Sequence, residues 1–175
     1  DPLSPRGWEQ MRTAVGDYCD WQVIVSSPLV RCAHFARELA ERLDRPLEIV
    51  PEFTELSFGV WEGRSVADVH AADPLTLARF WRDPVTYPIP EGEPVADFDR
   101  RIGKAWNALQ ERHQGRHLLL VVHGGVIRMV LRHLLDMPVW RIWRIEVPFA
   151  ALSRIRQHRD LDAEPHLVFH NGRLA

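Results

Sequence analysis

The segment LLLVVHGGVIR, residues 118–128, places a histidine and two glycines directly after an apolar run. Five consecutive apolar residues, 118–122, are typical of a strand buried on both faces, as in a parallel sheet. Residues 126–135 follow with helical spacing. A histidine at such a junction lies at the carboxyl edge of the sheet, where open α/β proteins bind their ligands. The segment therefore predicts an α/β fold with a functional site around His123.

The rest of the chain repeats this alternation of short apolar runs with segments of helical spacing, and no internal repeat interrupts it. Strands that alternate with helices indicate a three-layer α/β/α sandwich with a mostly parallel sheet. The predicted helices are 5–15, 30–43, one or two short ones within 66–82, 95–114 and 126–135, and the predicted strands are 22–26, 47–50, 118–122, 143–147, 151–156 and 165–169.

The chain has 175 residues, and no segment has the composition of a linker. We therefore expect one domain over 1–175, with the short helices and the following loop forming a small cap at about 64–94. The sequence opens on Asp1-Pro2-Leu3-Ser4 without an initiator methionine, and we interpret it as lacking upstream residues.

The bulk composition argues against several classes of protein. A formal net charge of -2 does not favour a nucleic-acid-binding protein, and no apolar run approaches the ~20 residues that span a bilayer. Cys19 and Cys32 form no metal-ligand spacing, so we expect no metal and no cofactor. Two free thiols in a reducing cytoplasm are the simpler interpretation, and a single disulfide is the alternative. The oligomeric state stays open, a homodimer included.

Arg31 lies at a second strand-to-helix junction, in SSPLVR, residues 26–31. A helix start offers unpaired N–H groups, and a guanidinium adds two parallel donors, so together they suit an anion. Taken alone, Arg31 is more simply a surface arginine. Lys104 is the only lysine among 22 Lys+Arg residues. This bias is compatible with phosphate binding, although a GC-rich genome explains it more simply.

Three further residue types suit chemistry at this edge. Gly124, after His123, lets the backbone approach a ligand. The alternative for His123 is a histidine that only caps the turn. Glu55 is flanked by apolar residues, and desolvation would raise its pKa toward that of a general acid. A solvated loop glutamate is the alternative, and Glu62 is a second candidate acid. Trp81 could line a pocket for an aromatic substrate, although core packing is favoured for the tryptophans.

Together these motifs resemble the histidine phosphatase (phosphoglycerate mutase-like) superfamily over nearly the whole chain. One loop departs from the family pattern, with Glu91 in place of a glycine and Pro94 in place of a serine. The matching stretches are DPLSPRGWEQ (1–10), SSPLVR (26–31), ELSFGVWEG (55–63), PEGE (90–93) and VHGGVIR (122–128).

The resemblance implies a phosphatase that uses a phosphohistidine intermediate and no metal. It implies that Arg31 and His123 hold the phosphoryl oxygens, and that Glu55 is the general acid and then the base. The family's nucleophile comes from an Arg-His-Gly motif on an upstream strand inside the sheet, and this sequence contains no such triplet. We interpret that strand as missing from the sequence rather than from the protein.

Within the superfamily, the segment 134–138 and Trp143 resemble the α-ribazole phosphatases of cobalamin biosynthesis. The resemblance therefore implies a small phosphate ester as the partner, with α-ribazole 5′-phosphate as the leading candidate. The alternatives are a broad-specificity phosphatase, a phosphoglycerate mutase, and a non-catalytic relative that binds a phosphorylated ligand. We expect no nucleic-acid or membrane partner, and a cytoplasmic location.

Overall fold

The computed structural model describes residues 1–157 and 164–174. Its central sheet contains β1 (Val23–Ser26), β2 (Leu47–Ile49) and β3 (Leu118–Val121) in the order β2-β1-β3, and both pairings are parallel. β1 pairs with β3 from Val23 opposite Leu118 to Ser26 opposite Val121. The carboxyl ends of β1 and β3 therefore lie side by side, and each leads directly into a helix.

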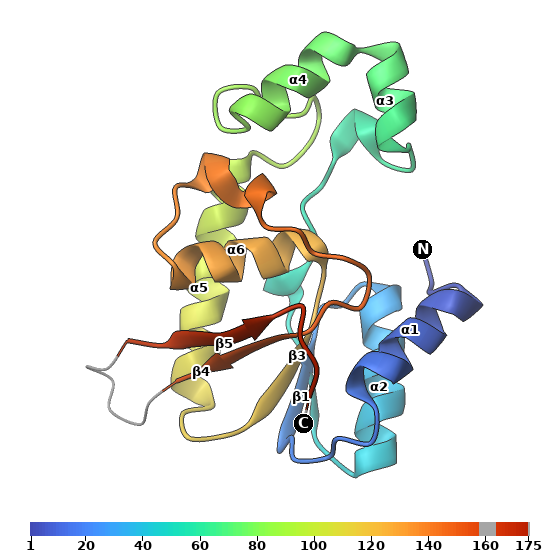
Figure 1. Ribbon diagram of the computed structural model, residues 1–175, viewed down its shortest axis with the longest axis vertical. Coiled ribbons are helices and arrows are strands. Elements are labelled where there is room, and N and C mark those ends of the chain that lie inside the picture. The colour runs from blue at the N-terminus through green and yellow to red at the C-terminus, as the bar shows by residue number, and fades with distance from the viewer. Residues whose placement is uncertain (158–163, 175) are drawn as a thin grey trace.

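Helices cover both faces of this sheet, which confirms the predicted sandwich. α1 (Pro5–Val15) and α2 (Val30–Leu43) lie on one face, and α5 (Val95–Arg112) and α6 (Gly124–Leu134) lie on the other (Figure 1). The side chains of β1 alternate between two hydrophobic cores, one on each face. A strand buried on both sides needs apolar residues on both faces, and Val23, Ile24 and Val25 provide them in β1.

The predicted cap segment folds into two short helices, α3 (Val66–Ala72) and α4 (Pro74–Arg82). The Asp73-Pro74 step separates them, because the Asp73 side chain caps α4 and Pro74 occupies its first turn. These helices stand apart from the layers in Figure 1. Phe80 on α4 nevertheless belongs to the same core as α5 and α6, so the apolar interior is continuous from the sandwich into the cap.

The last two strands, β4 (Ser153–Arg156) and β5 (His166–His170), confirm two sequence predictions. They form a separate antiparallel pair. A cavity of about 470 Å³ separates β4 from β3, and its walls include backbone and side chains of both strands together with residues of α5 and α6. Residues of both strands therefore line one cavity, together with polar side chains at the end of α5.

The predicted strand at 143–147 is wrong. Val139–Arg144 forms a 3-10 helix, η3, and within residues 1–157 and 164–174 no strand contains 143–147. The alternation WRIEV imitates the two-residue period of a strand. Helical turns instead bring Ile142 into the core and Trp143 against the aromatic side chains of the cap. Tertiary packing of these two side chains overrides the local pattern.

Two composition predictions can also be compared with the structure. Cys19 is exposed and Cys32 is buried, and both are free thiols, so the alternative of a disulfide is not supported. In the part of the chain that the structure describes, no helix is both long and apolar enough to cross a bilayer.

Candidate active site

His123 is the N-cap residue of α6 and is only 6% exposed. The Nε of Arg31 donates to its Nδ1 over 3.2 Å, and its Nε2 lies 2.7 Å from the Ser27 hydroxyl oxygen. Because an arginine can only donate, Nδ1 must be the acceptor and Nε2 must carry the proton of the neutral ring. The two junctions predicted from the sequence therefore meet at one imidazole.

The surroundings of His123 keep it uncharged at neutral pH. Burial lowers the pKa of this imidazole to about 3, and the positive charge of Arg31 acts in the same direction. An incoming phosphate dianion would oppose both effects. The single N–H donor of the neutral ring, which here faces Ser27, is the group that can turn to a phosphoryl oxygen, while Arg31 supplies the positive charge.

Arg31 is the second residue of α2, and its side chain is partly buried. Contact with His123 uses Nε, one of five donors on a planar fork. Within residues 1–157 and 164–174, the other donors of this guanidinium have no hydrogen-bond partner. The geometry leaves two parallel N–H groups for an anionic ligand near the start of α2.

Glu55 lies between the 3-10 helices η1 (Pro51–Phe53) and η2 (Gly59–Trp61) and reaches the start of α6. Its Oε2 accepts from the Gly125 N–H over 3.0 Å, and its Oε1 accepts from the Leu56 N–H over 3.0 Å. The first N–H groups of a helix have no partner inside the helix, so the carboxylate occupies an anion position at the α6 N-terminus. Gly124 and Gly125 form the first turn there.

Burial makes the ionised form of Glu55 less favourable than it is in water. Burial raises the pKa of this carboxyl group, opposed by the Gly125 and Leu56 N–H groups and then by the charges of Arg31 and Arg128. Desolvation is therefore the larger influence, as the apolar flanks of Glu55 in the sequence indicate.

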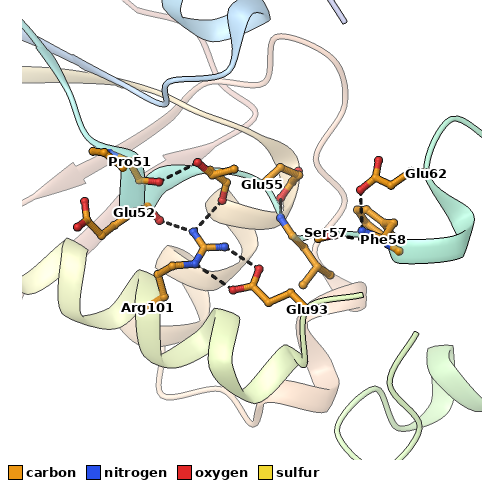
Figure 2. A network of polar contacts seen from close by, with 11 residues as sticks. Pro51, Glu52, Glu55, Ser57, Phe58, Glu62, Glu93 and Arg101 are labelled. Carbon is orange, nitrogen blue, oxygen red and sulfur yellow. Dashed lines mark hydrogen bonds and ion pairs between the residues drawn. The ribbon is translucent and has the colours of Figure 1, made fainter. Parts of the chain in front are cut away.

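The second candidate acid and the predicted substrate contact lie elsewhere. Glu62 is exposed and accepts from the Phe58 N–H over 2.7 Å, so it stabilises its own loop, as Figure 2 shows. Trp81, on α4, is 38% exposed and lies edge-on to Trp143 at 4.6 Å between ring centroids. No contact in the described part of the chain joins Trp81 directly to Arg31, Glu55 or His123.

Three residues near the site were not singled out from the sequence. Ser27 is fully buried against His123, and Cys32 has its Sγ 3.6 Å from the Nδ1 of the same ring. Arg128 donates from Nε to the Ile145 carbonyl oxygen, and its guanidinium lies 5.7 Å from the Trp143 ring centroid. The sequence does indicate Arg128 through its helical spacing, since it lies one turn beyond Gly124 and therefore on the same face of α6.

Replacing Arg128 with glutamine should raise the pKa of Glu55. The charged and titratable groups that act on or near this carboxyl group are Arg31 and Cys32 on α2 and Arg128 on α6. Removing one cation removes stabilisation of the carboxylate, so Glu55 should hold its proton to higher pH. Carboxyl-carbon NMR titration of Glu55 measures this shift, with the exposed Arg141→Gln as control. An unchanged titration in Arg128→Gln would contradict the electrostatic role of Arg128.

Metal ligands are not gathered at this site. Across residues 1–157 and 164–174, no group of three or more His, Cys, Asp or Glu side chains is placed to hold a metal ion.

A partly buried cation and a histidine at the carboxyl ends of parallel strands, with a carboxyl group at an adjacent helix start, define an α/β protein with a site suited to an anionic ligand. The sequence model of the histidine phosphatase superfamily (branch 1) matches residues 1–168. The chain belongs to this family and is a phosphatase.

Similar proteins include several phosphatases of small molecules. The adenosylcobalamin/α-ribazole phosphatase of Salmonella typhimurium is 30% identical over 156 residues, covering 88% of this chain and 77% of that protein. A bifunctional protein of Mycobacterium tuberculosis is 30% identical over 98% of this chain, which spans only 48% of that protein.

Solved structures agree with these similarities. The α-ribazole phosphatase of Shigella flexneri has a TM-score of 0.80 at 27% identity, covering 98% of this chain and 84% of that one. A mycobacterial glucosyl-3-phosphoglycerate phosphatase has a TM-score of 0.81 at 26% identity, covering 99% and 89%. Similarity of this order extends to phosphatases with different substrates.

Proposed function

We propose that this protein hydrolyses phosphate monoesters through a phosphohistidine intermediate. The observation that carries the proposal is the contact between Arg31 and His123, with Glu55 held at the start of the same α6 helix. Arg31 and His123 bind the equatorial phosphoryl oxygens and stabilise the charge that they carry in the transition state. The Glu55 carboxyl group lies next to them, at the start of α6, and in its protonated form it would donate to the leaving oxygen.

The reaction has two steps. In the first, a histidine nitrogen attacks phosphorus, the ester P–O bond breaks, and the leaving oxygen takes the proton of Glu55. In the second, the Glu55 carboxylate accepts a proton from a water molecule, the water oxygen attacks phosphorus, and the P–N bond breaks. The products are an alcohol and inorganic phosphate, and Glu55 is protonated again.

The attacking histidine belongs, in this proposal, to an extended strand that carries Arg-His-Gly. The cavity lined by residues of both β3 and β4 supports this proposal, because a strand placed there would lie next to both. A strand parallel to β3 would bring its carboxyl end to the edge where Ser27 and His123 lie. It would also pair backbone groups that the gap leaves without strand partners.

We propose α-ribazole 5′-phosphate as the substrate and the cytoplasm as the location. The Salmonella and Shigella relatives are named for this activity, and an aromatic base could pack against Trp81 and Trp143 of the cap. A broad-specificity phosphatase remains the main alternative, since the mycobacterial relative acts on a different ester.

A substrate panel without added metal tests this proposal on protein that carries the Arg-His-Gly strand. It should include α-ribazole 5′-phosphate, phosphoserine and 3-phosphoglycerate. Selective hydrolysis of the first ester is the expected result, and a phosphoryl-exchange assay separates a hydrolase from a mutase. Inactivity on every ester would favour the non-catalytic alternative.

Replacing Trp81 with alanine should raise the KM for α-ribazole 5′-phosphate about tenfold, because stacking of a base on an aromatic ring contributes roughly 1–3 kcal/mol. The KM for phosphoserine, which has no ring, should stay unchanged. Trp140→Ala is the matched control, since Trp140 is 51% exposed on η3. Equal effects of Trp81→Ala on both esters would contradict an aromatic substrate contact.

A further inference from the structure

Arg101, on α5, makes more polar contacts than a simple ion pair requires. Its Nε and Nη2 donate to the two carboxylate oxygens of Glu93 over 3.0 and 2.6 Å. Its Nη1 donates to the carbonyl oxygen of Thr54 over 2.9 Å and also to that of Glu52 (Figure 2). The guanidinium fork therefore joins one side chain and two main-chain carbonyls in a single plane.

These partners belong to the two chain segments that connect the cap to the sandwich. We call residues 52–59 the entry leg and residues 89–94 the exit leg. The Glu93 N–H donates to the Ser57 carbonyl oxygen over 3.0 Å, and the Val60 N–H donates to that of Pro90 over 3.2 Å. A Cβ at Gly59, whose φ is +47°, would lie 2.2 Å from the Pro90 carbonyl oxygen. The legs are thus in backbone contact, and Arg101 fastens both to α5.

Thr54, at the end of this network, directly precedes Glu55. The orientation of the Thr54 peptide affects where the next side chain points, and in this orientation the Glu55 carboxyl group accepts from the Gly125 N–H over 3.0 Å. The side chains of Arg101 and Glu93 are 25% and 19% exposed, so both charges are partly desolvated. Such a pair contributes little net stability for its desolvation cost. The pair is therefore better explained by the way it fixes the positions of the two legs than by a gain in stability.

We propose that Arg101 is a positioning residue for Glu55: it ties the entry and exit legs to α5 and thereby holds the Glu55 carboxyl group at the start of α6. This inference rests on the proposed role of Glu55 as general acid. Arg101 itself touches no reacting atom in this scheme. Its contribution is the fixed direction of the Thr54–Glu55 main chain.

Amide hydrogen exchange in Arg101→Gln tests the proposal. The Gly125 N–H lies in the first turn of α6 and depends on Glu55 for its acceptor, and the Leu56 N–H donates to the same carboxyl group. Both amides should exchange at least about tenfold faster in Arg101→Gln, because their hydrogen bonds are lost. The Ile24 N–H, which donates to the Pro46 carbonyl oxygen in the sheet, should keep its wild-type rate.

Arg100→Gln is the matched control. Arg100 is the preceding residue on α5 and forms an exposed ion pair with Asp97, with side-chain exposures of 62% and 52%. It carries the same charge but contacts neither leg, so all three amides should keep their rates. Glu93→Gln, which removes the anchor of the fork, should accelerate Gly125 and Leu56 in the same direction by a smaller factor.

Unchanged exchange of Gly125 and Leu56 in folded Arg101→Gln would overturn the proposal. If that variant does not fold, Arg101→Lys decides in its place. A lysine keeps the charge but cannot bridge Glu93 and two carbonyls, so faster exchange of both amides supports the proposal and wild-type exchange overturns it. The measurement uses no substrate. A protein without phosphatase activity would therefore contradict the proposed function and leave this test intact.

Discussion

Replacing His123 with alanine should lower kcat by about 100- to 1000-fold, or about 2.7–4 kcal/mol of transition-state stabilisation. The imidazole contacts Arg31 directly, so the variant removes one phosphoryl ligand and also releases the partner that orients the other. Steady-state kinetics on protein that carries the Arg-His-Gly strand measures the loss. Binding of vanadate, which resembles the pentacoordinate transition state, should weaken in parallel.

The control for this variant is His34→Ala, an exposed histidine one helical turn beyond Arg31 on α2. It should leave turnover unchanged. Because His123 is buried, thermal unfolding of His123→Ala must be compared with wild type, and kcat must be expressed per folded molecule. Near-normal turnover of folded His123→Ala would show that the phosphoryl group binds elsewhere.

Replacing Gly125 with alanine should abolish most activity without destabilising the fold. A Cβ at Gly125 would lie 2.2 Å from Oε1 and 3.0 Å from Cδ of Glu55, so the carboxyl group must leave its position. General acid catalysis contributes about 100- to 10,000-fold, and a displaced acid should cost at least the lower figure in kcat. The atoms that the new Cβ meets belong to the end of the flexible Glu55 side chain, so the main chain of α6 should keep its position.

Gly103→Ala provides the comparison for this prediction. Its Cβ would lie 2.8 Å from the His133 ring, so it creates a similar clash between α5 and α6 away from Glu55. Gly103→Ala should lower the melting temperature and keep kcat per folded molecule, the reverse of Gly125→Ala. Wild-type kcat in Gly125→Ala would mean that Glu55 is not the general acid in its present position.

Much of the fold could be predicted because buried parallel strands are marked by their composition. Residues 23–25 and 118–122 are apolar throughout, and both strands end within one residue of the predicted position. The structure brings Arg31 and His123 together for the reason used in the prediction, because parallel strands that are neighbours in the sheet end at the same edge. Glu55, which was predicted from its apolar flanks, reaches the start of α6 from the loop between η1 and η2.

The remaining features depend on contacts that no local pattern encodes. Arg101 acts on Thr54, 47 residues earlier in the chain, and nothing in the surrounding helix distinguishes it from Arg100. The wrong prediction at 143–147 has the same origin. The position of Trp143 is determined by its contacts with Phe80 and Trp81 in the cap, and not by the alternation of apolar and polar residues around it. Trp81 was a candidate substrate contact because it is aromatic, with core packing as the favoured alternative, and its position relative to bound substrate depends on the cap.

The paired strands β1 and β3 lie far apart in the sequence, and this affects when the site forms during folding. β1 and β3 pair through residues about a hundred positions apart, and the Arg31–His123 contact spans 92 positions. Loops of this length must close before either contact forms, and non-local pairing of this kind slows folding. Any partly folded state with α1, α2 and β1 alone would contain Arg31 without its contact to His123. The proposed phosphoryl site is therefore incomplete until β3 joins the sheet, so recovery of phosphate binding should report completion of the sheet rather than formation of helices.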